Sequence, residues 1–346
     1  MTKILVTGAS GFIGSFIVEE GLARGHRVWA GMRTSSSRKY LTDPRTEFAE
    51  LNLNQPDILR TQLKKYKEEF GGWDVIVHAA GATKCIRRED FFRTNTEGTR
   101  NLVNSLRELD MVPRRFVFVS SLSVFGAIRE QATRKATADN PWIYAPIKET
   151  DTPQPNTAYG ESKLEAERFL KSLPDFPYVI LRPTGVYGPR ERDYFVMAQS
   201  ISQHVDFSVG YQPQEITFVY VKDLVQAVFS AMEKDVAGRE YFISDGGVYH
   251  STEFSDLIRQ ELGSPFMLRI KAPVWFLNLI CTVNGTISTW RKKTTTLNRD
   301  KFHILCQRNW QCDIEPAVKE LGYHPEYPLE RGVKETIAWY KKEKWL

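Results

Sequence analysis

The chain has 346 residues, of which 42% are hydrophobic and 26% charged, which is typical of a globular protein with a sizeable core and argues against disorder. Its net charge of +5 comes from scattered basic residues, apart from a small group at Arg291, Lys292 and Lys293, and is too weak to predict nucleic-acid binding. The cysteines (Cys85, Cys281, Cys306 and Cys312) form no C-x-x-C pair and lie in no histidine cluster, so we expect reduced, structural thiols and no metal site.

The first predicted element is a short strand at residues 4–6, an apolar run rich in β-branched side chains that reads as buried on both faces. Gly8, Gly11 and Gly14 follow at the spacing G-x-x-G-x-x-G, and a helical pattern then continues toward Gly25. Glycines at these positions let the backbone turn sharply and bring its N–H groups close to a pyrophosphate, at the positive end of a helix. The segment therefore predicts a dinucleotide-binding loop, with an ordinary glycine-rich turn as the alternative.

The second predicted strand, Arg27 to Ala30, decides which dinucleotide is expected. An acid about twenty residues past the glycines binds the ribose hydroxyls of NAD, whereas an arginine accommodates the 2′-phosphate of NADP. This chain has Arg33 there, followed by a threonine, three serines, Arg38 and Lys39. A guanidinium makes a charge-assisted grip on phosphate, so NADP is favoured over NAD, unless the segment is merely a basic surface loop.

Further apolar strands are predicted at 47–53, 74–80 and 115–120, each separated from the next by a helical segment. Strands that alternate with helices, without hairpin signals, predict an α/β fold with a Rossmann-type, doubly wound parallel sheet. Ligands bind beyond the carboxyl ends of such strands, where Gly8, Gly81 and Ser121 all fall, and Asn52 is a candidate contact for the adenine edge.

The pattern changes after residue 125. The polar, proline-containing stretch 126–156 is too long for a plain connection, so we expect it to cover a substrate. We assign 1–183 to the dinucleotide-binding domain, with 218–237 returning to it, and 184–217 with 238–346 to a smaller, discontinuous substrate lobe. The apolar run VWFLNLIC at 274–281 is too short for a membrane span, and a core or pocket-lining helix is favoured over surface anchoring.

Tyr159 and Lys163 lie four residues apart in YGESK, on one face of a predicted helix. A phenol titrates near 10, and a nearby ammonium stabilises its phenolate, so the pair can act as a general acid and base. Ser121 follows a parallel strand and can hold a carbonyl or alcohol oxygen in the same crevice while hydride moves to or from a nicotinamide. Taken alone, the Tyr–Lys pair could be an ordinary helix-surface contact and the serine an ordinary helix cap. Together with the glycine loop they predict a redox site.

Several ordered motifs carry a family resemblance: TGASGFIG, HAAG, NTEGTRNL, SSLSVFG, YGESK and LRPTGVYGPRERD. They resemble the extended short-chain dehydrogenase/reductase superfamily, also called the NAD-dependent epimerase/dehydratase family, over roughly residues 1 to 235. The resemblance implies that Tyr159 is the catalytic acid/base, that Lys163 also binds the nicotinamide ribose and that Ser121 is the third catalytic residue. It further implies that Asn95 is a structural and proton-relay position and that Arg182 and Pro183 approach the cofactor. The complete set of expected cofactor contacts is Gly8, Ser10, Gly11, Phe12, Ile13, Gly14, Arg33, Asn52, Leu53, Ala79, Ala80, Gly81, Tyr159, Lys163, Arg182 and Pro183.

The branch of the family is less clear from the motifs. Members that act on nucleotide sugars typically carry Arg-Asp-Phe or Arg-Asp-Tyr just before the strand that reads FVYVKDL here, and their arginine grips the diphosphate. This chain has Glu215, Ile216 and Thr217, and an acid there would repel phosphate. The departure favours the branch resembling dihydroflavonol reductases and 3β-hydroxysteroid dehydrogenases, although Arg190 or Arg192 could grip a diphosphate from another position.

We therefore expect an NAD(P)-dependent oxidoreductase acting on a ketone or secondary alcohol of a mostly apolar small-molecule substrate. The alternatives are a nucleotide-sugar epimerase or dehydratase with tightly bound NAD, and a non-catalytic NADP-sensing regulator. The first strand begins almost at the start of the sequence, leaving no room for a secretory signal, which predicts a cytoplasmic protein without an integral membrane span. The resemblance also implies a possible homodimer through the helices that start near Glu97 and Tyr159.

Overall fold

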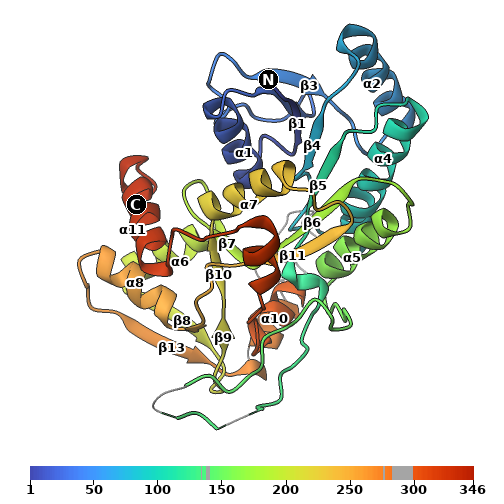
Figure 1. The fold of residues 1–346 in the computed structure, drawn as a ribbon. Coiled ribbons are helices and arrows are strands. Elements are labelled where there is room, and N and C mark those ends of the chain that lie inside the picture. Colours follow the sequence, from blue (N-terminus) through green and yellow to red (C-terminus); the bar gives the residue numbers. More distant parts are fainter. Residues whose placement is uncertain (134, 138–140, 276, 283–298) are drawn as a thin grey trace.

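The computed structural model describes residues 1–133, 135–137, 141–275, 277–282 and 299–346 (Figure 1). The basic group Arg291 to Lys293 lies outside the described residues. The central element is a seven-stranded parallel sheet, in the order β11-β6-β5-β4-β1-β2-β3. Its strands are β1 (Lys3–Thr7), β2 (Arg27–Met32), β3 (Glu47–Glu50), β4 (Val75–His78), β5 (Arg115–Val119), β6 (Tyr178–Pro183) and β11 (Arg239–Ile243).

Helices cover both faces of this sheet (Figure 1). On one face α1 (Phe12–Ala23) and α7 (Val221–Glu233) pack together, and on the other lie α2 (Pro56–Phe70), α4 (Gly98–Glu108) and α5 (Ala158–Lys171). Side chains of a strand alternate between the faces, so Ile4 and Val6 join the core under α1 and α7 while Leu5 joins the other core. This double burial explains why the first strand is apolar without interruption, and it confirms the predicted doubly wound fold.

Short elements link β4 to α4 and β5 to α5. They are α3 (Arg88–Phe91), the π-helical turn η1 (Phe92–Glu97) and the 3₁₀ turn η2 (Leu122–Val124).

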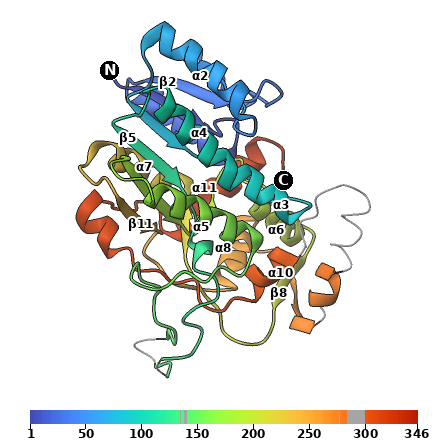
Figure 2. The same cartoon turned by 90° about the vertical axis from the view of Figure 1, so that its right-hand side faces the viewer.

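A smaller lobe built mainly from the second half of the chain lies beyond the carboxyl ends of the strands (Figures 1 and 2). It contains three two-stranded sheets, β7–β10, β9–β12 and β8–β13, and a core rich in aromatic side chains. Its elements are β7 (Gly185–Tyr187), α6 (Asp193–Ser202), β8 (Val205–Val209), β9 (Glu215–Ile216), β10 (Phe218–Tyr220), β12 (Tyr249–His250), α8 (Glu253–Glu261), β13 (Leu268–Ala272), α10 (Arg299–Cys306) and α11 (Leu329–Lys342). The π-helical turn η3 (Ala317–Leu321) packs instead against α7 and β11, in the core of the central sheet.

One boundary of the predicted domain division is wrong. Residues 238–346 were assigned to the lobe as a whole, but β11 pairs in parallel with β6 along its full length and forms the edge of the central sheet. The segment that returns to the sheet therefore extends to Ile243. The reason is that Tyr241 and Ile243 complete the core beneath α7, which would otherwise have an open apolar flank.

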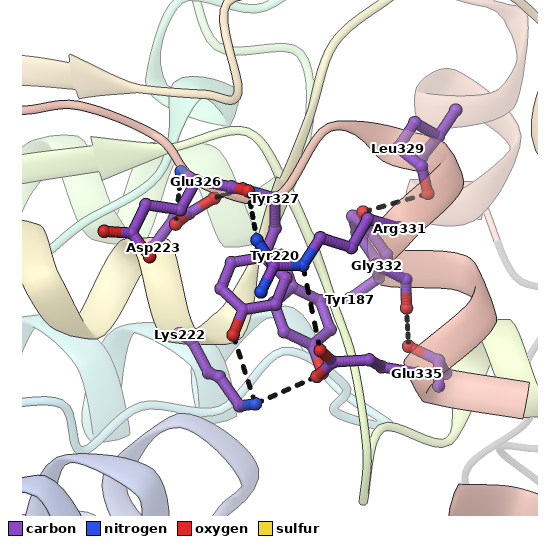
Figure 3. A network of polar contacts seen from close by, with 11 residues as sticks. Tyr187, Tyr220, Lys222, Asp223, Glu326, Tyr327, Leu329, Arg331, Gly332 and Glu335 are labelled. Carbon is purple, nitrogen blue, oxygen red and sulfur yellow. Dashed lines mark hydrogen bonds and ion pairs between the residues drawn. The ribbon is translucent and has the colours of Figure 1, made fainter. Parts of the chain in front are cut away.

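A polar network fastens α11 to the strand–helix junction of β10 and α7 (Figure 3). Asp223 accepts hydrogen bonds from the backbone N–H groups of Glu326 and Tyr327, at 2.9 and 3.0 Å. Glu335 accepts from the Tyr220 hydroxyl at 3.0 Å and from Lys222 Nζ at 2.9 Å. Two carboxylates on different elements thus fix the orientation of the last helix against the lobe.

None of the helices in the described part of the chain is long and apolar enough to span a bilayer.

Candidate active site

A cavity of about 950 Å³ lies between the carboxyl edge of the central sheet and the lobe. Most of the expected cofactor and catalytic residues line it, from the glycine loop to Pro183. Two do not: Asn95 is buried beside it and Arg182 is turned away from it. Among the described residues, no group of three or more His, Cys, Asp or Glu side chains is arranged to hold a metal ion.

The glycine loop forms one end of the cavity. Gly8 has a φ of +71°, and a Cβ atom on Gly14 would lie 2.3 Å from the Gly8 carbonyl oxygen, so neither position accommodates a side chain. Helix α1 follows with Gly11 as its N-cap, without a side-chain cap and without an acid in its first turn. Its first N–H groups therefore remain available, at the positive end of the helix dipole, which fits the pyrophosphate of a dinucleotide.

The next section of the wall contains Arg33, Asn52 and Leu53. Within the described residues Arg33 makes no ion pair, whereas the guanidinium of Arg38 stacks 3.9 Å from the ring centroid of Phe48 and does not line the cavity. A carboxylate that sequence reasoning missed lies nearby, because Glu50 at the end of β3 accepts a hydrogen bond from the Thr34 hydroxyl. Strand pairing, invisible in the order of the residues, brings Glu50 to the position beside the loop after β2.

Asn95 sits in the π-helical turn η1 and is completely buried. Its Oδ1 accepts from the Ala82 N–H at 2.7 Å, and its Nδ2 donates to the Ala82 carbonyl at 3.1 Å and to Ser162 Oγ at 2.9 Å. The side chain thereby joins the loop after β4 to helix α5. This geometry fits the structural part of the role expected for Asn95.

Helix α5 presents Tyr159 and Lys163 on one face, toward the cavity. The N-cap residue Thr157 accepts from the Gly160 N–H at 3.0 Å, which fixes the start of the helix. Burial raises the pKa of the Tyr159 phenol to about 12, although the Ser121 hydroxyl opposes the shift. The predicted trio of Ser121, Tyr159 and Lys163 is thus brought together at the carboxyl end of β5.

The ammonium of Lys163 is held deep in the site. Its Nζ donates to the Val119 carbonyl at 2.8 Å, and a Cβ atom on Gly81 would lie only 3.1 Å from it. Burial lowers the pKa of Lys163 to about 8, while Glu167 one turn later opposes the shift. The ammonium is therefore charged at neutral pH but loses its proton at mildly alkaline pH.

A buried chain of hydrogen bonds that the sequence did not reveal connects the glycine loop to Asn95. Thr99 Oγ1 donates to the Asn95 carbonyl at 2.7 Å, so it accepts from His78 Nε2 at 3.0 Å. His78 Nδ1 then accepts from the Thr7 hydroxyl at 2.7 Å, and Thr7 Oγ1 in turn accepts from the Ala80 N–H at 3.3 Å. Burial lowers the pKa of His78 to about 3, so the ring is neutral and the direction of the chain is fixed.

The far end of the cavity is lined mainly by apolar side chains of the lobe: Met197, Phe207, Ile216, Phe218, Phe254, Ile304, Leu305 and Trp310. Three charged residues also line it, and each has a partner. Asp193 pairs with Lys84 and, at 3.5 Å, with Lys301, while the Glu191 carboxylate accepts from the Asp193 and Tyr194 N–H groups at 2.8 and 2.7 Å. This end suits a substrate with a large apolar surface.

The expectation that Arg182 approaches the cofactor does not fit the structure. Its guanidinium is buried between Glu167 and Glu240 and lies over the rings of Phe125 and Phe242. The ion pairs turn the side chain away from the cavity, so Arg182 connects β6 to α5 and β11.

The expected electrostatic role of Glu215 is also wrong. Its carboxylate accepts from the Ile143 N–H, from the Tyr144 N–H at 3.1 Å and from Gln311 Nε2, and it does not line the cavity. It organises the stretch 126–156, which we expected to cover a substrate, but none of the described residues of this stretch lines the cavity. Ile216 and Thr217 do line the cavity.

Neither arginine proposed as a substitute grip reaches the cavity. Arg190 Nη1 donates to Ser15 Oγ at 2.8 Å and its Nη2 pairs with Glu19 at 2.6 Å, and Arg192 lies 5.8 Å from the ring centroid of Trp345.

Comparisons with known proteins agree with this arrangement. The family model of the NAD dependent epimerase/dehydratase family matches residues 4–244. A decarboxylating sterol-4-alpha-carboxylate 3-dehydrogenase of Schizosaccharomyces pombe is 25% identical and covers 99% of each chain. A UDP-glucose 4-epimerase of Vibrio cholerae is 26% identical over 96% of this chain and 94% of its own. The crystal structure of dTDP-glucose 4,6-dehydratase from Bacillus anthracis in complex with NAD has the same fold, with a TM-score of 0.75 and 20% identity over 100% of this chain and 98% of its own.

Proposed function

Since the chain belongs to the NAD dependent epimerase/dehydratase family and is an enzyme of the extended short-chain dehydrogenase type, we propose that it is an NADP-dependent oxidoreductase. It reduces a ketone, or oxidises the corresponding secondary alcohol, on a mostly apolar small molecule. The sterol-4-alpha-carboxylate 3-dehydrogenase relative, which matches along the whole chain, supports a dehydrogenase of this kind.

The single observation that carries the proposal is the polarity of the cavity. Ser121, Tyr159 and Lys163 lie at the end of the central sheet, and the wall beyond them is mainly apolar, from Met197 to Trp310. Among the described residues, its charged groups beyond Lys163 and Arg33 are Glu191, Asp193 and Lys301, and all three are engaged with protein groups. A nucleoside diphosphate would find its charges poorly matched there.

In the reductive direction, the Ser121 and Tyr159 hydroxyls hold the carbonyl oxygen, and Tyr159 donates its proton to that oxygen as the alcohol forms. The charge of Lys163 then stabilises the phenolate until a proton returns from solvent. NADPH, when bound along the glycine loop, supplies the hydride. The N–H groups of the first turn of α1 hold the pyrophosphate and Arg33 takes the 2′-phosphate, which fixes the orientation of the dinucleotide.

The second reading is a nucleotide-sugar epimerase or dehydratase that retains NAD. The UDP-glucose 4-epimerase relative favours it, since it matches nearly as well as the sterol dehydrogenase. In that case Glu50 would be the acid that binds the ribose of NAD, because it lies beside the loop after β2. The third reading, an NADP-sensing regulator, gives no reason for the trio of catalytic side chains.

The test combines cofactor identity with turnover. Mass spectrometry of whatever dinucleotide copurifies separates the readings: tightly retained NAD supports the epimerase or dehydratase, whereas an empty or exchangeable site supports the reductase. When the protein is mixed with NADPH and each of a panel of apolar ketones, the nicotinamide absorbance should fall at a rate that depends on Tyr159. Two results together would support the regulator: the Tyr159→Phe protein binds the cofactor with normal affinity, and the wild type turns over no substrate.

We also propose a cytoplasmic location and, as an assembly, a homodimer. The proposed contact is formed by α4 and α5, which lie on the same face of the sheet (Figure 2). Measurement of the molar mass in solution tests the dimer.

A further inference from the structure

Gln214 precedes β9 and lines the active-site cavity, although the residue is only 7% exposed. Its Nε2 donates to the backbone carbonyls of Leu305 and Gln307, at 2.8 Å each. A carbonyl oxygen can only accept a hydrogen bond, so these two contacts decide which end of the amide is the nitrogen. The amide oxygen Oε1 therefore faces away from the two carbonyls.

This oxygen of Gln214 is not used by the protein. No group of the described residues donates to it, and it is not one of the polar atoms that the protein encloses completely. Since the residue is nearly buried and lines the cavity, we take the open side of Oε1 to be the cavity side. The amide thus offers the cavity a hydrogen-bond acceptor in a fixed orientation.

Gln307 shows what an amide without this role looks like. Its Nε2 also donates to two carbonyls, those of Gly126 and Asn309, at 3.0 and 2.9 Å. Its Oε1, however, is completely enclosed without a partner, and the residue does not line the cavity. The two glutamines are anchored alike, and they differ in what their oxygens can reach.

The other residues at this end of the cavity favour an uncharged ligand group. Ile216 and Leu305 are apolar, and the Thr217 hydroxyl already donates to the Trp310 carbonyl at 2.6 Å. The charged residues are paired or bonded within the protein. A neutral donor suits an amide oxygen in such a wall, because a charged group would lose its hydration against apolar side chains. The neutral donor of an otherwise apolar molecule is a hydroxyl.

Helix α10 indicates how far this acceptor lies from the catalytic trio. Near the start of the helix Asp300 accepts from the Tyr159 N–H at 3.4 Å, and near its end the Leu305 carbonyl accepts from Gln214. An α-helix rises about 7 to 8 Å between these two positions, so a ligand that reaches from Tyr159 to Gln214 is on the order of 10 Å long. Two linked or fused rings have this length, whereas a small acyclic ketone does not.

We propose that Gln214 is a specificity-determining residue, whose Oε1 accepts a hydrogen bond from a hydroxyl at the far end of the substrate. The substrate is a neutral ketone with a rigid apolar body and a hydroxyl on the order of 10 Å from the reacting carbonyl. A ligand that covers Oε1 with an apolar group or a second carbonyl leaves this acceptor without a hydrogen bond, which lowers affinity. The reacting carbonyl rests on the proposed function, and the hydroxyl subsite does not.

The test uses three ketones built on the 4,4′-bicyclohexyl skeleton. At the carbon farthest from the ketone, the first carries a hydroxyl, the second a carbonyl and the third only hydrogen. Calorimetric titration measures their dissociation constants with NADPH present, in a Tyr159→Phe background that prevents turnover during the measurement. We expect the hydroxy ketone to bind about tenfold more tightly than the plain ketone, and the diketone to bind no more tightly than the plain ketone.

In the same background, Gln214→Met keeps the length of the side chain but removes the acceptor, and should reduce the preference for the hydroxy ketone to less than about twofold. The matched control is Gln307→Met, which removes an amide with the same kind of anchoring outside the cavity and should keep the preference. Circular dichroism melting checks that both variants fold. If Gln214 only anchors α10, Gln214→Met should weaken all three ketones equally, and this result would overturn the proposal. Equal binding of the three ketones before substitution, or binding of none, would overturn it as well.

Turnover by the chain with Tyr159 intact separates this proposal from the proposed reaction. Binding with the expected preference, but no oxidation of NADPH with any of the three ketones, would contradict the reductase and leave the hydroxyl subsite in place. Reduction of all three ketones with the same KM would support the reductase and contradict the subsite.

Discussion

Arg182 of β6 and Glu167 of α5 form a two-point ion pair inside the protein. Arg182 Nη2 lies 2.6 Å from Glu167 Oε2 and Nε lies 3.1 Å from Oε1, with side-chain exposures of 2% and 1%. Glu167 also accepts from the Ser120 hydroxyl at 2.5 Å. Because Glu167 follows Lys163 by one turn of α5, this pair fixes the depth and rotation of the helix that carries the proposed acid/base.

Removing one partner of this pair should be costly. We expect Glu167→Gln to lower the free energy of unfolding by about 3 kcal/mol, because it leaves the buried guanidinium without its main counter-charge. Glu165→Gln on the same helix is the control, since its pair with Arg168 is exposed and should contribute less than about 1 kcal/mol. Urea denaturation measures both, and equal effects would contradict the assignment.

Tyr159→Phe should abolish proton transfer without disturbing the fold. We expect kcat to fall by about 10²- to 10⁴-fold, the range for loss of a general acid, with the dissociation constant for NADPH nearly unchanged. Tyr178→Phe removes a hydroxyl from a tyrosine that does not line the cavity and should keep normal turnover. A Tyr159→Phe protein with more than about a tenth of the wild-type rate would exclude Tyr159 as the acid.

The pH dependence of the reduction should follow Lys163. Its pKa of about 8 predicts a rate that is level at neutral pH and falls as the ammonium loses its proton above pH 8. The fall does not reflect unfolding, because a lysine whose pKa is lowered on folding makes the folded state more stable as pH rises from about 8 toward its ordinary value of 10.5. Lys163→Arg keeps its charge, so any residual activity should show no such fall. A break at the same pH in that variant would assign it to another group.

Arg33 should decide the choice of cofactor. We expect Arg33→Ala to raise KM for NADPH by about 10- to 100-fold, since a charged hydrogen bond is worth about 1.5 to 3 kcal/mol, while KM for NADH stays the same. Arg38→Ala is the control, because that guanidinium lies over Phe48 and not at the cavity. If both variants lose NADPH affinity alike, the effect is a general loss of positive charge.

His78 should make the protein sensitive to acid. Its pKa of about 3 in the folded state lies below the ordinary 6.5, so the unfolded chain binds more protons as pH falls below 6.5. Between pH 7 and pH 5 this group alone should remove about 2 kcal/mol of stability. Urea denaturation at both pH values should show that the His78→Gln variant, although less stable than the wild type at pH 7, does not lose this additional 2 kcal/mol or so of unfolding free energy at pH 5. An identical pH dependence in the variant would contradict the buried neutral ring.

The sequence was informative where chemistry depends on local spacing. The glycine loop and the Tyr159–Lys163 pair each lie within one turn or one strand–helix junction, so their geometry follows from the backbone alone. Contacts between distant strands were not visible in this way. The Thr7–His78–Thr99 chain joins residues up to 92 positions apart, and Glu50 reaches Thr34 only because β3 pairs with β2.

The same reasoning explains the errors. Arg182 and Glu215 were judged from their neighbours in sequence, and each is instead bound to partners from other elements. For a charged side chain, the position of its counter-charge decides whether it faces a cavity or the core, and a single sequence does not contain that information.

The fastening of α11 by Asp223 and Glu335 has a consequence for synthesis. The ribosome releases the six strands β1 to β6 in order, and they can pair as they emerge. By contrast, the lobe that starts at Gly185 cannot complete its core until α11 has been synthesised. Val333 and Ile337 of that helix pack in the core around Tyr187 and Phe254. A nascent chain that still lacks this helix exposes a cluster of aromatic side chains, which is the form of the protein most in need of a chaperone.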